Sequence, residues 1–297
     1  MPTLLAVPNV SEGRDERVVD ELAAAFAAGA RLLDRHSDPT HNRSVFTLAG
    51  EPGALADALA AGARATVEAI DMRAHEGAHP CVGALDVCPV VFLDDGDIDV
   101  AEAEARAAAE AIAALGVPVF FYGELARTPA RRERAFFRRG GLAELGRRLA
   151  ERELHPDLGP RALHETAGAT LVTARPPLAA FNLELAGATI QAGRAIARAL
   201  RESGGGLPGV RAIALELEGG VVQVSTNVHD PVGLPLARVV ERVAQLAEPH
   251  EARVTAAEIV GLVPEAALAG FPEDLPIRGF DRDRGTIEAR LRDAPGG

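Results

Sequence analysis

The sequence predicts an α+β fold made of two similar halves, each with the element order β-α-β-β-α-β. In each half, two segments carry apolar residues at helical spacing, and short apolar runs typical of strands lie around them. The 297 residues, of which 47% are hydrophobic, are enough for one large domain or two small ones. A doubly wound sheet is the alternative, but no Gly-rich turn follows the first strand. We therefore expect two split βαβ units of the ferredoxin-like type.

In the first half, Pro8 ends a short apolar strand and Gly29 ends the first helix. Either Ser11 or Asp15 is placed to cap the start of that helix. A strand interrupted by Pro89 completes the unit. The predicted strands are 4–7, 31–34, 44–48 and 85–93, and the predicted helices are 15–28 and 55–70.

The second half repeats this order, and Gly50-Glu-Pro-Gly53 and Asp230-Pro-Val-Gly233 each lead from a third strand into a second helix. Its predicted strands are 179–185, 211–217, 221–224 and 253–257, and its predicted helices are 189–202 and 236–247. Between the halves, residues 94–176 contain a predicted helix at 100–115, a predicted strand at 117–122 and an Arg-rich segment. The expected domains are 1–176 and 177–297.

Charge and composition exclude several classes of function. The formal net charge is -12, from 43 acidic residues and 31 basic residues that are all arginine. An acidic chain does not suit general nucleic-acid binding, and the absence of lysine excludes Schiff-base, pyridoxal-phosphate and P-loop chemistry. No apolar stretch is long enough for a membrane span. With only Cys81 and Cys88 and no secretory leader pattern, we expect a reduced cytoplasmic protein.

The segment His75-Glu-Gly-Ala-His79 formally matches the H-E-x-x-H zinc-protease motif. That motif requires a helix, and Gly77 and Pro80 disfavour one, so we expect a loop without metal. His79 is then a candidate general acid–base, or a plain surface histidine. Cys81 is either a thiolate nucleophile paired with His79 or, as we favour, a small residue that fills space in the loop.

Two further polar segments are candidates. Asp34–Arg43 contains two histidines, Asp34, Asp38, Asn42 and Arg43, and it either binds a carboxylate and orients a proton carrier or forms a solvated hairpin loop. Residues 127–148 contain eight arginines. They either attract an anionic substrate or, as we favour, form a solvated helix face with Phe136 and Phe137 on its buried side.

Short motifs in collinear order along nearly the whole chain resemble those of the glutamate formimidoyltransferase family. They also resemble the transferase part of the animal bifunctional formimidoyltransferase–cyclodeaminase. The motifs are Val7-Pro-Asn-Val-Ser-Glu-Gly13, the loop ending Asn42-Arg43, Gly77-Ala-His-Pro80, Gly83-Ala-Leu-Asp-Val-Cys-Pro89, Val117-Pro-Val-Phe-Phe-Tyr-Gly-Glu124, Pro156-Asp-Leu-Gly-Pro160, Gly168-Ala-Thr170, Ala180-Phe-Asn182, Gln223-Val-Ser-Thr-Asn227 and Val260-Gly-Leu-Val-Pro264.

The resemblance implies transfer of a formimino group from N-formimino-L-glutamate to N5 of tetrahydrofolate, a step of histidine degradation. It implies a substrate tunnel between two similar subdomains, a homodimer, no metal, and His79 as the catalytic acid–base. The folate-binding segment implied by the resemblance comprises Gly159, Pro160, Arg161, Ala162, Leu163, His164, Glu165, Thr166, Ala167 and Gly168. The candidate substrate contacts are Asn9, Asp34, Asp38, Asn42, Arg43, His75 and Arg175.

Three positions depart from the family pattern: Cys81 stands where an arginine is common, Ala167 where animal enzymes have an aromatic residue, and His36 where they have an acid. These departures leave His79 in place and concern recognition of the glutamate donor. Two other functions therefore stay open. One is another folate one-carbon activity, such as cyclisation or hydrolysis of 5-formyltetrahydrofolate, and the other is folate binding without turnover.

Overall fold

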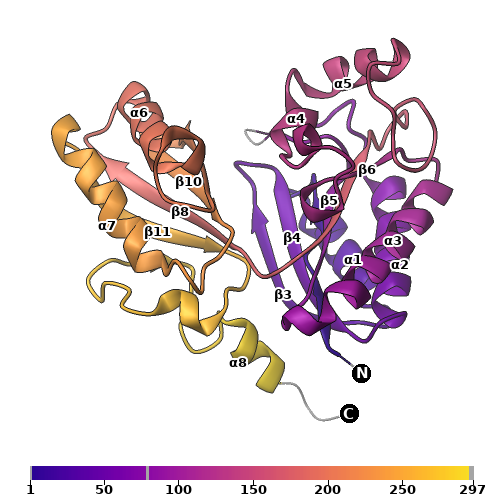
Figure 1. Ribbon diagram of the computed structural model, residues 1–297, viewed down its shortest axis with the longest axis horizontal. Coiled ribbons are helices and arrows are strands. Elements are labelled where there is room, and N and C mark those ends of the chain that lie inside the picture. Colours follow the sequence, from indigo (N-terminus) through magenta and orange to yellow (C-terminus); the bar gives the residue numbers. More distant parts are fainter. Residues whose placement is uncertain (1, 78–79, 294–297) are drawn as a thin grey trace. The chain divides into compact units, whose positions relative to one another are not determined.

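The computed structural model describes residues 2–77 and 80–293 of the chain. His79, the predicted acid–base, lies outside the described residues. The chain divides into two compact units, Met1–Pro176 and Pro177–Gly297, each with its own sheet (Figure 1). The predicted α+β class is therefore confirmed. None of the described helices combines the length and the apolar character needed to cross a bilayer.

The first unit contains seven strands and five α-helices among its described residues. The strands are β1 (Leu4–Ala6), β2 (Asn9–Val10), β3 (Arg31–Asp38), β4 (Arg43–Gly50), β5 (Leu85–Val91), β6 (Val119–Phe121) and β7 (Thr170–Arg175). The helices are α1 (Glu16–Phe26), α2 (Ala54–Ala69), α3 (Ile98–Ala114), α4 (Ala135–Arg138) and α5 (Gly141–Ala150). Asp15 caps α1 by accepting hydrogen bonds from the backbone N–H groups of Arg17 and Val18, one of the two alternatives expected.

The first strand of this sheet is interrupted after Ala6, and its two parts, β1 and β2, lie in the middle of the sheet. Both β1 and β2 lie between β4 and β5 and are antiparallel to each of them. On one side, β3 continues the sheet antiparallel to β4. On the other side β7 lies between β5 and β6, parallel to both. The intervening segment 94–176 therefore extends the first sheet by two strands.

The two faces of the first sheet are covered differently. Helices α1, α2 and α3 pack on one face through a core that includes Phe26, Leu59 and Ile112 (Figure 1). On the other face, α4 and α5 cover β5, β6 and β7 through a second core that includes Phe137 and Leu171. The remainder of that face, over β2, β3 and β4, carries polar side chains from the loops and strand ends described below.

The second unit has the same strand order without the long extension. Its strands are β8 (Ala179–Ala186), β9 (Val210–Glu216), β10 (Val222–Val228), β11 (Arg253–Val260) and β12 (Ile277–Arg278), and its helices are α6 (Ile190–Leu200), α7 (Leu236–Ala247) and α8 (Ile287–Arg292). In the sheet, β8 lies between β10 and β11, β9 pairs with β10, and β12 pairs with β11. Helices α6 and α7 share one apolar core with alternate residues of these strands.

One predicted strand was too short, and several elements were not predicted. Strand β3 continues to Asp38, so the expected polar loop at 36–43 shrinks to residues 39–42 because Ser37 and Asp38 pair with Ser44 and Arg43. Strands β7 and β12 and helix α8 were not predicted. Strand β7 carries buried residues on both faces, so it shows no alternation of apolar and polar residues.

A buried carboxylate in the extension supports the first unit. Gly53 starts α2 with a φ of 89° and provides no side-chain cap of its own. Glu104 on α3 accepts hydrogen bonds from the backbone N–H of Gly53 at 2.9 Å and of Ala56 at 2.6 Å. The N-terminal amides of α2 are thus satisfied by a side chain about fifty residues later in the sequence.

Candidate active site

The chain just before residues 78–79 is held by Asn42. Asn42 has a positive φ of 47°, which asparagine tolerates better than most residues. Its Oδ1 accepts a hydrogen bond from the Gly13 N–H at 3.0 Å, and its Nδ2 donates one to the Glu76 carbonyl at 3.1 Å. A Cβ atom on Gly77 would lie 2.5 Å from the His41 carbonyl oxygen, so only glycine fits there.

The chain just after residues 78–79 is held by Ser11 and Asp86. The Asp86 Oδ1 accepts a hydrogen bond from the Val82 N–H at 2.7 Å. Ser11 donates from its hydroxyl to the Gly83 carbonyl and from its backbone to the Ala84 carbonyl, each at 2.8 Å. The loop that contains His79 in the sequence is therefore anchored at both ends to the loops that follow β2 and precede β4.

His75 and Cys81 flank this loop. Residues 75–77 are not helical, as predicted from Gly77 and Pro80. Burial lowers the pKa of His75, partly offset by a hydrogen bond to the Ser11 backbone, so its imidazole is neutral at pH 7. Burial and the nearby Asp86 carboxylate raise the pKa of the Cys81 thiol. That shift disfavours a thiolate nucleophile and supports the interpretation of Cys81, which is half-buried, as a filler of the loop.

Asp38 orders the turn between β3 and β4. Its Oδ1 accepts hydrogen bonds from the backbone N–H of Thr40 and His41, and its Oδ2 contacts the His41 imidazole. Burial alone would raise the pKa of Asp38, but the hydrogen bonds from His41 and Thr40 outweigh it and lower the pKa to about 2. Asp34, His36 and Asp38 alternate along β3 opposite Thr47, Val45 and Arg43 of β4, so these polar residues share one face.

Three arginines of the first unit gather near Asp86, and a fourth, Arg175, lies near Arg134 and Tyr122. Arg138 forms an ion pair with Asp86, whose side chain is 2% exposed. Arg43 and Arg134 are partly buried in the electrostatic field of Asp86 and Arg138. The Arg134 guanidinium carbon lies 6.0 Å from the centre of the Tyr122 ring, and Arg175 hydrogen-bonds the same tyrosine. The solvated helix face predicted for residues 127–148 is therefore wrong for Arg134 and Arg138.

The prediction of a solvated helix face fails for these two arginines because α4 is short and packs closely on the sheet. This helix has only four residues, and it buries Phe137 completely against Phe120 of the sheet. Arg134 and Arg138, four residues apart, therefore lie on the same side of the helix. The sequence signal was this spacing, but a run of eight arginines concealed it. Asp86 was not predicted as a site residue because it lies within an otherwise apolar strand.

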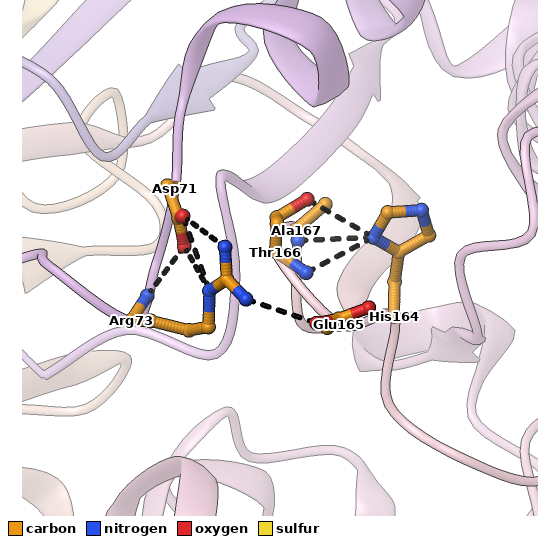
Figure 2. A network of polar contacts seen from close by, with 6 residues as sticks. All are labelled: Asp71, Arg73, His164, Glu165, Thr166 and Ala167. Carbon is orange, nitrogen blue, oxygen red and sulfur yellow. Dashed lines mark hydrogen bonds and ion pairs between the residues drawn. The ribbon is translucent and has the colours of Figure 1, made fainter.

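The predicted folate-binding segment ends in a tight turn, shown in Figure 2. The backbones of His164 and Gly168 exchange two hydrogen bonds, at 2.9 and 3.0 Å. The His164 Nδ1 accepts hydrogen bonds from the backbone N–H of Thr166 at 3.3 Å and of Ala167 at 3.1 Å, so this nitrogen carries no proton. Arg73 bridges Asp71 and Glu165 across the outside of the turn.

This turn lies directly against the chain that follows residues 78–79. The Ala84 N–H donates to the Ala167 carbonyl, and the Ala169 N–H donates to the Val82 carbonyl, both at 2.9 Å. A Cβ atom on Gly83 would lie 2.1 Å from the Ala169 carbonyl oxygen, so the two backbones touch. The segment 164–168 is thus close to the loop 75–83, whereas Gly159, Pro160, Arg161 and Ala162 are exposed.

Asn9 and Arg175 donate to nearby backbone carbonyls, and a further polar group lies in the second unit. The Asn9 amide donates to the Val7 carbonyl at 2.9 Å, and Arg175 donates to the Pro176 carbonyl at 2.9 Å. In the second unit, Asn182 and Gln223 donate to the Glu258 carboxylate at 2.8 and 3.3 Å, a polar group that sequence reasoning missed. Within residues 2–77 and 80–293, no three His, Cys, Asp or Glu side chains are grouped as a metal site requires.

Comparison with known proteins gives a match over almost the whole chain. A family model described as the formiminotransferase domain, N-terminal subdomain, matches residues 3–175, and one described as the formiminotransferase domain matches residues 180–271. Glutamate formimidoyltransferase from Streptococcus pyogenes is 37% identical over 96% of this chain and 97% of its own length.

Two further relatives show the same similarity. Glutamate formimidoyltransferase from Thermoplasma acidophilum is 37% identical over 95% of each chain. The formimidoyltransferase-cyclodeaminase from Sus scrofa is 40% identical over 88% of this chain, which corresponds to 50% of that longer protein.

Proposed function

The chain belongs to the formiminotransferase family, and from this membership we infer that it is a glutamate formimidoyltransferase. It transfers the formimino group of N-formimino-L-glutamate to N5 of tetrahydrofolate and releases glutamate and 5-formiminotetrahydrofolate. The observation that carries this function is the collinear match to curated glutamate formimidoyltransferases over 95% or more of both chains. Tetrahydrofolate is thus a co-substrate. We further propose a cytoplasmic homodimer that needs no metal.

Each unit, in this proposal, is a ferredoxin-like subdomain, with the substrate tunnel between the two. The strand order supports it: in both units the first strand lies between the third and fourth and is antiparallel to both. The catalytic residues are assigned to the first unit, residues 1–176, because the anchored loop, the predicted folate segment and the arginines all belong to it.

His79 acts as the acid–base of the transfer in this proposal. The N5 amine attacks the formimino carbon, a C–N bond forms, and the adduct carries a surplus proton on N5. His79 removes that proton and returns one to the glutamate nitrogen, so the bond from this nitrogen to the formimino carbon breaks with neutral amine as leaving group. A group with a pKa near neutrality can perform both steps.

The loop anchors support this role for His79. Asn42 and Ser11 hold the chain on both sides of residues 78–79 through hydrogen bonds to backbone groups, and catalytic groups need such support from neighbouring residues. His75 is neutral at pH 7, so it accepts or donates a hydrogen bond to substrate without adding a charge. Asp34, on the same face of β3 as Asp38, is proposed to lie near the cationic formimino group.

The segment Gly159–Gly168 binds tetrahydrofolate in this proposal. Its contact with residues 82–84 supports the assignment because it places the turn beside the anchored loop. The His164 Nε2 carries the ring proton when Nδ1 accepts hydrogen bonds, so it is a donor available to a carbonyl of the folate. Asn9 and Arg175 remain proposed contacts on the same face of the sheet.

A spectrophotometric assay with the purified protein tests the function. Incubation with N-formimino-L-glutamate and tetrahydrofolate should give 5-formiminotetrahydrofolate in amounts stoichiometric with released glutamate. Binding of tetrahydrofolate without product would identify a folate-binding protein instead. Conversion of 5-formyltetrahydrofolate in parallel reactions would identify a different one-carbon activity, related to the departures at Cys81, Ala167 and His36.

A further inference from the structure

The arginines near Asp86 carry more positive charge than the Asp86 carboxylate neutralises. Arg43, Arg134 and Arg138 contribute three positive charges around Asp86, which forms an ion pair with Arg138, and Arg175 adds a fourth charge near Arg134. Arg175 is occupied by the Pro176 carbonyl and Tyr122. Among the residues that the structure describes, none accepts a hydrogen bond from the guanidinium of Arg43 or of Arg134.

Such an arrangement is unfavourable without an anion. Burial lowers the pKa of Arg43, of Arg134 and, to about 10, of Arg175, and neighbouring arginines lower each pKa further. Asp86 and Tyr122 raise these pKa values in part, as do Asp38 for Arg43 and Glu133 for Arg134, but the pKa of each arginine stays below its ordinary value. All remain charged at neutral pH, so the protein holds like charges together in a partly desolvated place. The Nε of Arg138 is buried without a hydrogen-bond partner among the described residues. A protein retains such groups where a ligand supplies the missing charge.

We propose that Arg43 and Arg134, supported by Arg138 and Asp86, form the binding site for the carboxylate of the formimino donor. This inference rests on the proposed function for the identity of the donor. Guanidinium groups recognise carboxylates through paired N–H donors, and this chain has no lysine to do so. Asp86 holds Arg138 in place and fixes the Val82 backbone, so the site and the loop share one anchor.

The position of the site selects the donor over the glutamate tail of tetrahydrofolate. Arg43 follows Asn42, which holds the chain before residues 78–79, and Asp86 holds the chain after them. In the donor, the α-carboxylate is only a few bonds from the reacting carbon. In tetrahydrofolate, the carboxylates are at the opposite end of the molecule from N5. A carboxylate site beside the anchored loop therefore fits the donor.

Substitutions of single arginines test the proposal in the full-length protein. Arg43→Gln and Arg134→Gln should each raise the KM for N-formimino-L-glutamate by about tenfold or more, with little change in the KM for tetrahydrofolate. Calorimetry with L-glutamate as the probe should show a loss of affinity of the same size. Arg139→Gln removes the same charge from an exposed neighbour and should change neither value.

Two outcomes would overturn the proposal. A raised KM for tetrahydrofolate with an unchanged donor KM would assign the arginines to the folate tail, and unchanged values for both substrates would leave them a structural role. If circular dichroism shows that Arg43→Gln or Arg134→Gln is unfolded, the KM values of the other variant test the proposal. If the wild-type protein binds glutamate through these arginines but transfers no formimino group, the proposed function fails and the carboxylate site stands.

Discussion

The two units share a strand order, yet the first carries nearly all of the candidate chemistry. In both, helices pack on one face of the sheet, and the first strand lies between the third and fourth. The first unit adds an extension, residues 94–176, that contributes β6, β7, Arg134, Arg138, Arg175 and the turn 164–168. The second unit adds only β12 and α8 after its last shared strand, apart from short 3-10 turns. The common fold therefore supplies a scaffold, and the extension supplies most of the ligand-binding groups.

The polar residues of the two sheets also differ in charge. The first sheet carries arginines around Asp86, whereas the second carries the amides of Asn182 and Gln223 on the Glu258 carboxylate. The second group contains one charge, on Glu258, whereas the first brings Asp86 together with three arginines, so the second group has the smaller electrostatic cost. Substitutions in the first unit should therefore affect catalysis and stability more strongly than matched substitutions in the second.

The largest effect is expected for His79→Ala. Loss of a general acid–base should lower kcat by about 10²–10⁴-fold, while the dissociation constant for tetrahydrofolate barely changes. A stopped assay measures kcat, and a fluorescence titration measures the dissociation constant for tetrahydrofolate. His250→Ala, an exposed histidine of the second unit, is the matched control and should retain full activity. An equal loss of folate affinity in His79→Ala would instead assign His79 to binding.

Asp86→Asn should destabilise the protein by about 3–5 kcal/mol because it leaves Arg138 buried without its ion-pair partner. Urea unfolding measures the difference. The control in the second unit is Glu184→Gln, which breaks an ion pair with the largely exposed Arg278 and should cost about 1 kcal/mol or less. Similar losses in both variants would refute the contrast in electrostatic cost.

Glu104→Gln should lower stability by about 1–2 kcal/mol, since the neutral amide replaces a charged acceptor for three N–H contacts at the start of α2. The equivalent helix of the second unit, α7, starts after Pro235 without a side-chain cap. Glu110→Gln, exposed on the same helix as Glu104, is the control for the change in charge. Equal Tm values for Glu104→Gln and Glu110→Gln in thermal unfolding would contradict the role of Glu104 as the cap of α2.

The smallest effect is expected for the pH dependence that Asp38 contributes. Its pKa is about 2 in the folded protein and 3.8 ordinarily, so its stabilising effect is present above about pH 4 and is lost as the pH falls towards 2. Asp38→Asn should flatten that part of the acid-unfolding profile. Asp230→Asn, at an exposed turn of the second unit, should leave the profile unchanged. A profile of Asp38→Asn identical to the wild type would exclude this contribution.

Sequence reasoning predicted the elements whose signals are local. Helices α1, α2, α3, α6 and α7 show apolar residues at helical spacing, and each is found within a few residues of its predicted range. Strand β7 was missed because its burial depends on β5 and β6, which lie far away in the sequence. The extent of β3 was missed because polar residues continue the strand through pairing with β4.

The residues of the candidate site also fall into two groups, those with a local sequence motif and those brought together only by tertiary contacts. The resemblance predicts the His79 loop and the 159–168 segment as parts of the site from their motifs, and these assignments stay predictions. Residues 82–84 and 167–169 are in backbone contact, which the sequence did not predict. Arg134, Arg138 and Asp86 carry no motif, and only the short α4 brings them together. The four-residue spacing of Arg134 and Arg138 was a signal, but the same spacing is expected on a solvated helix face, so a single sequence does not distinguish the two.

The position of β7 between β5 and β6 affects the order in which the first unit can assemble on the ribosome. Strand β6 pairs only with β7 among the described strands, and β7 ends at Arg175, one residue before the last residue of the unit. Until that residue emerges, β5 has an open edge and β6 has no partner. Nascent chains halted before β7 should therefore be protease-sensitive and aggregation-prone, and completion of the sheet coincides with completion of the arginine cluster.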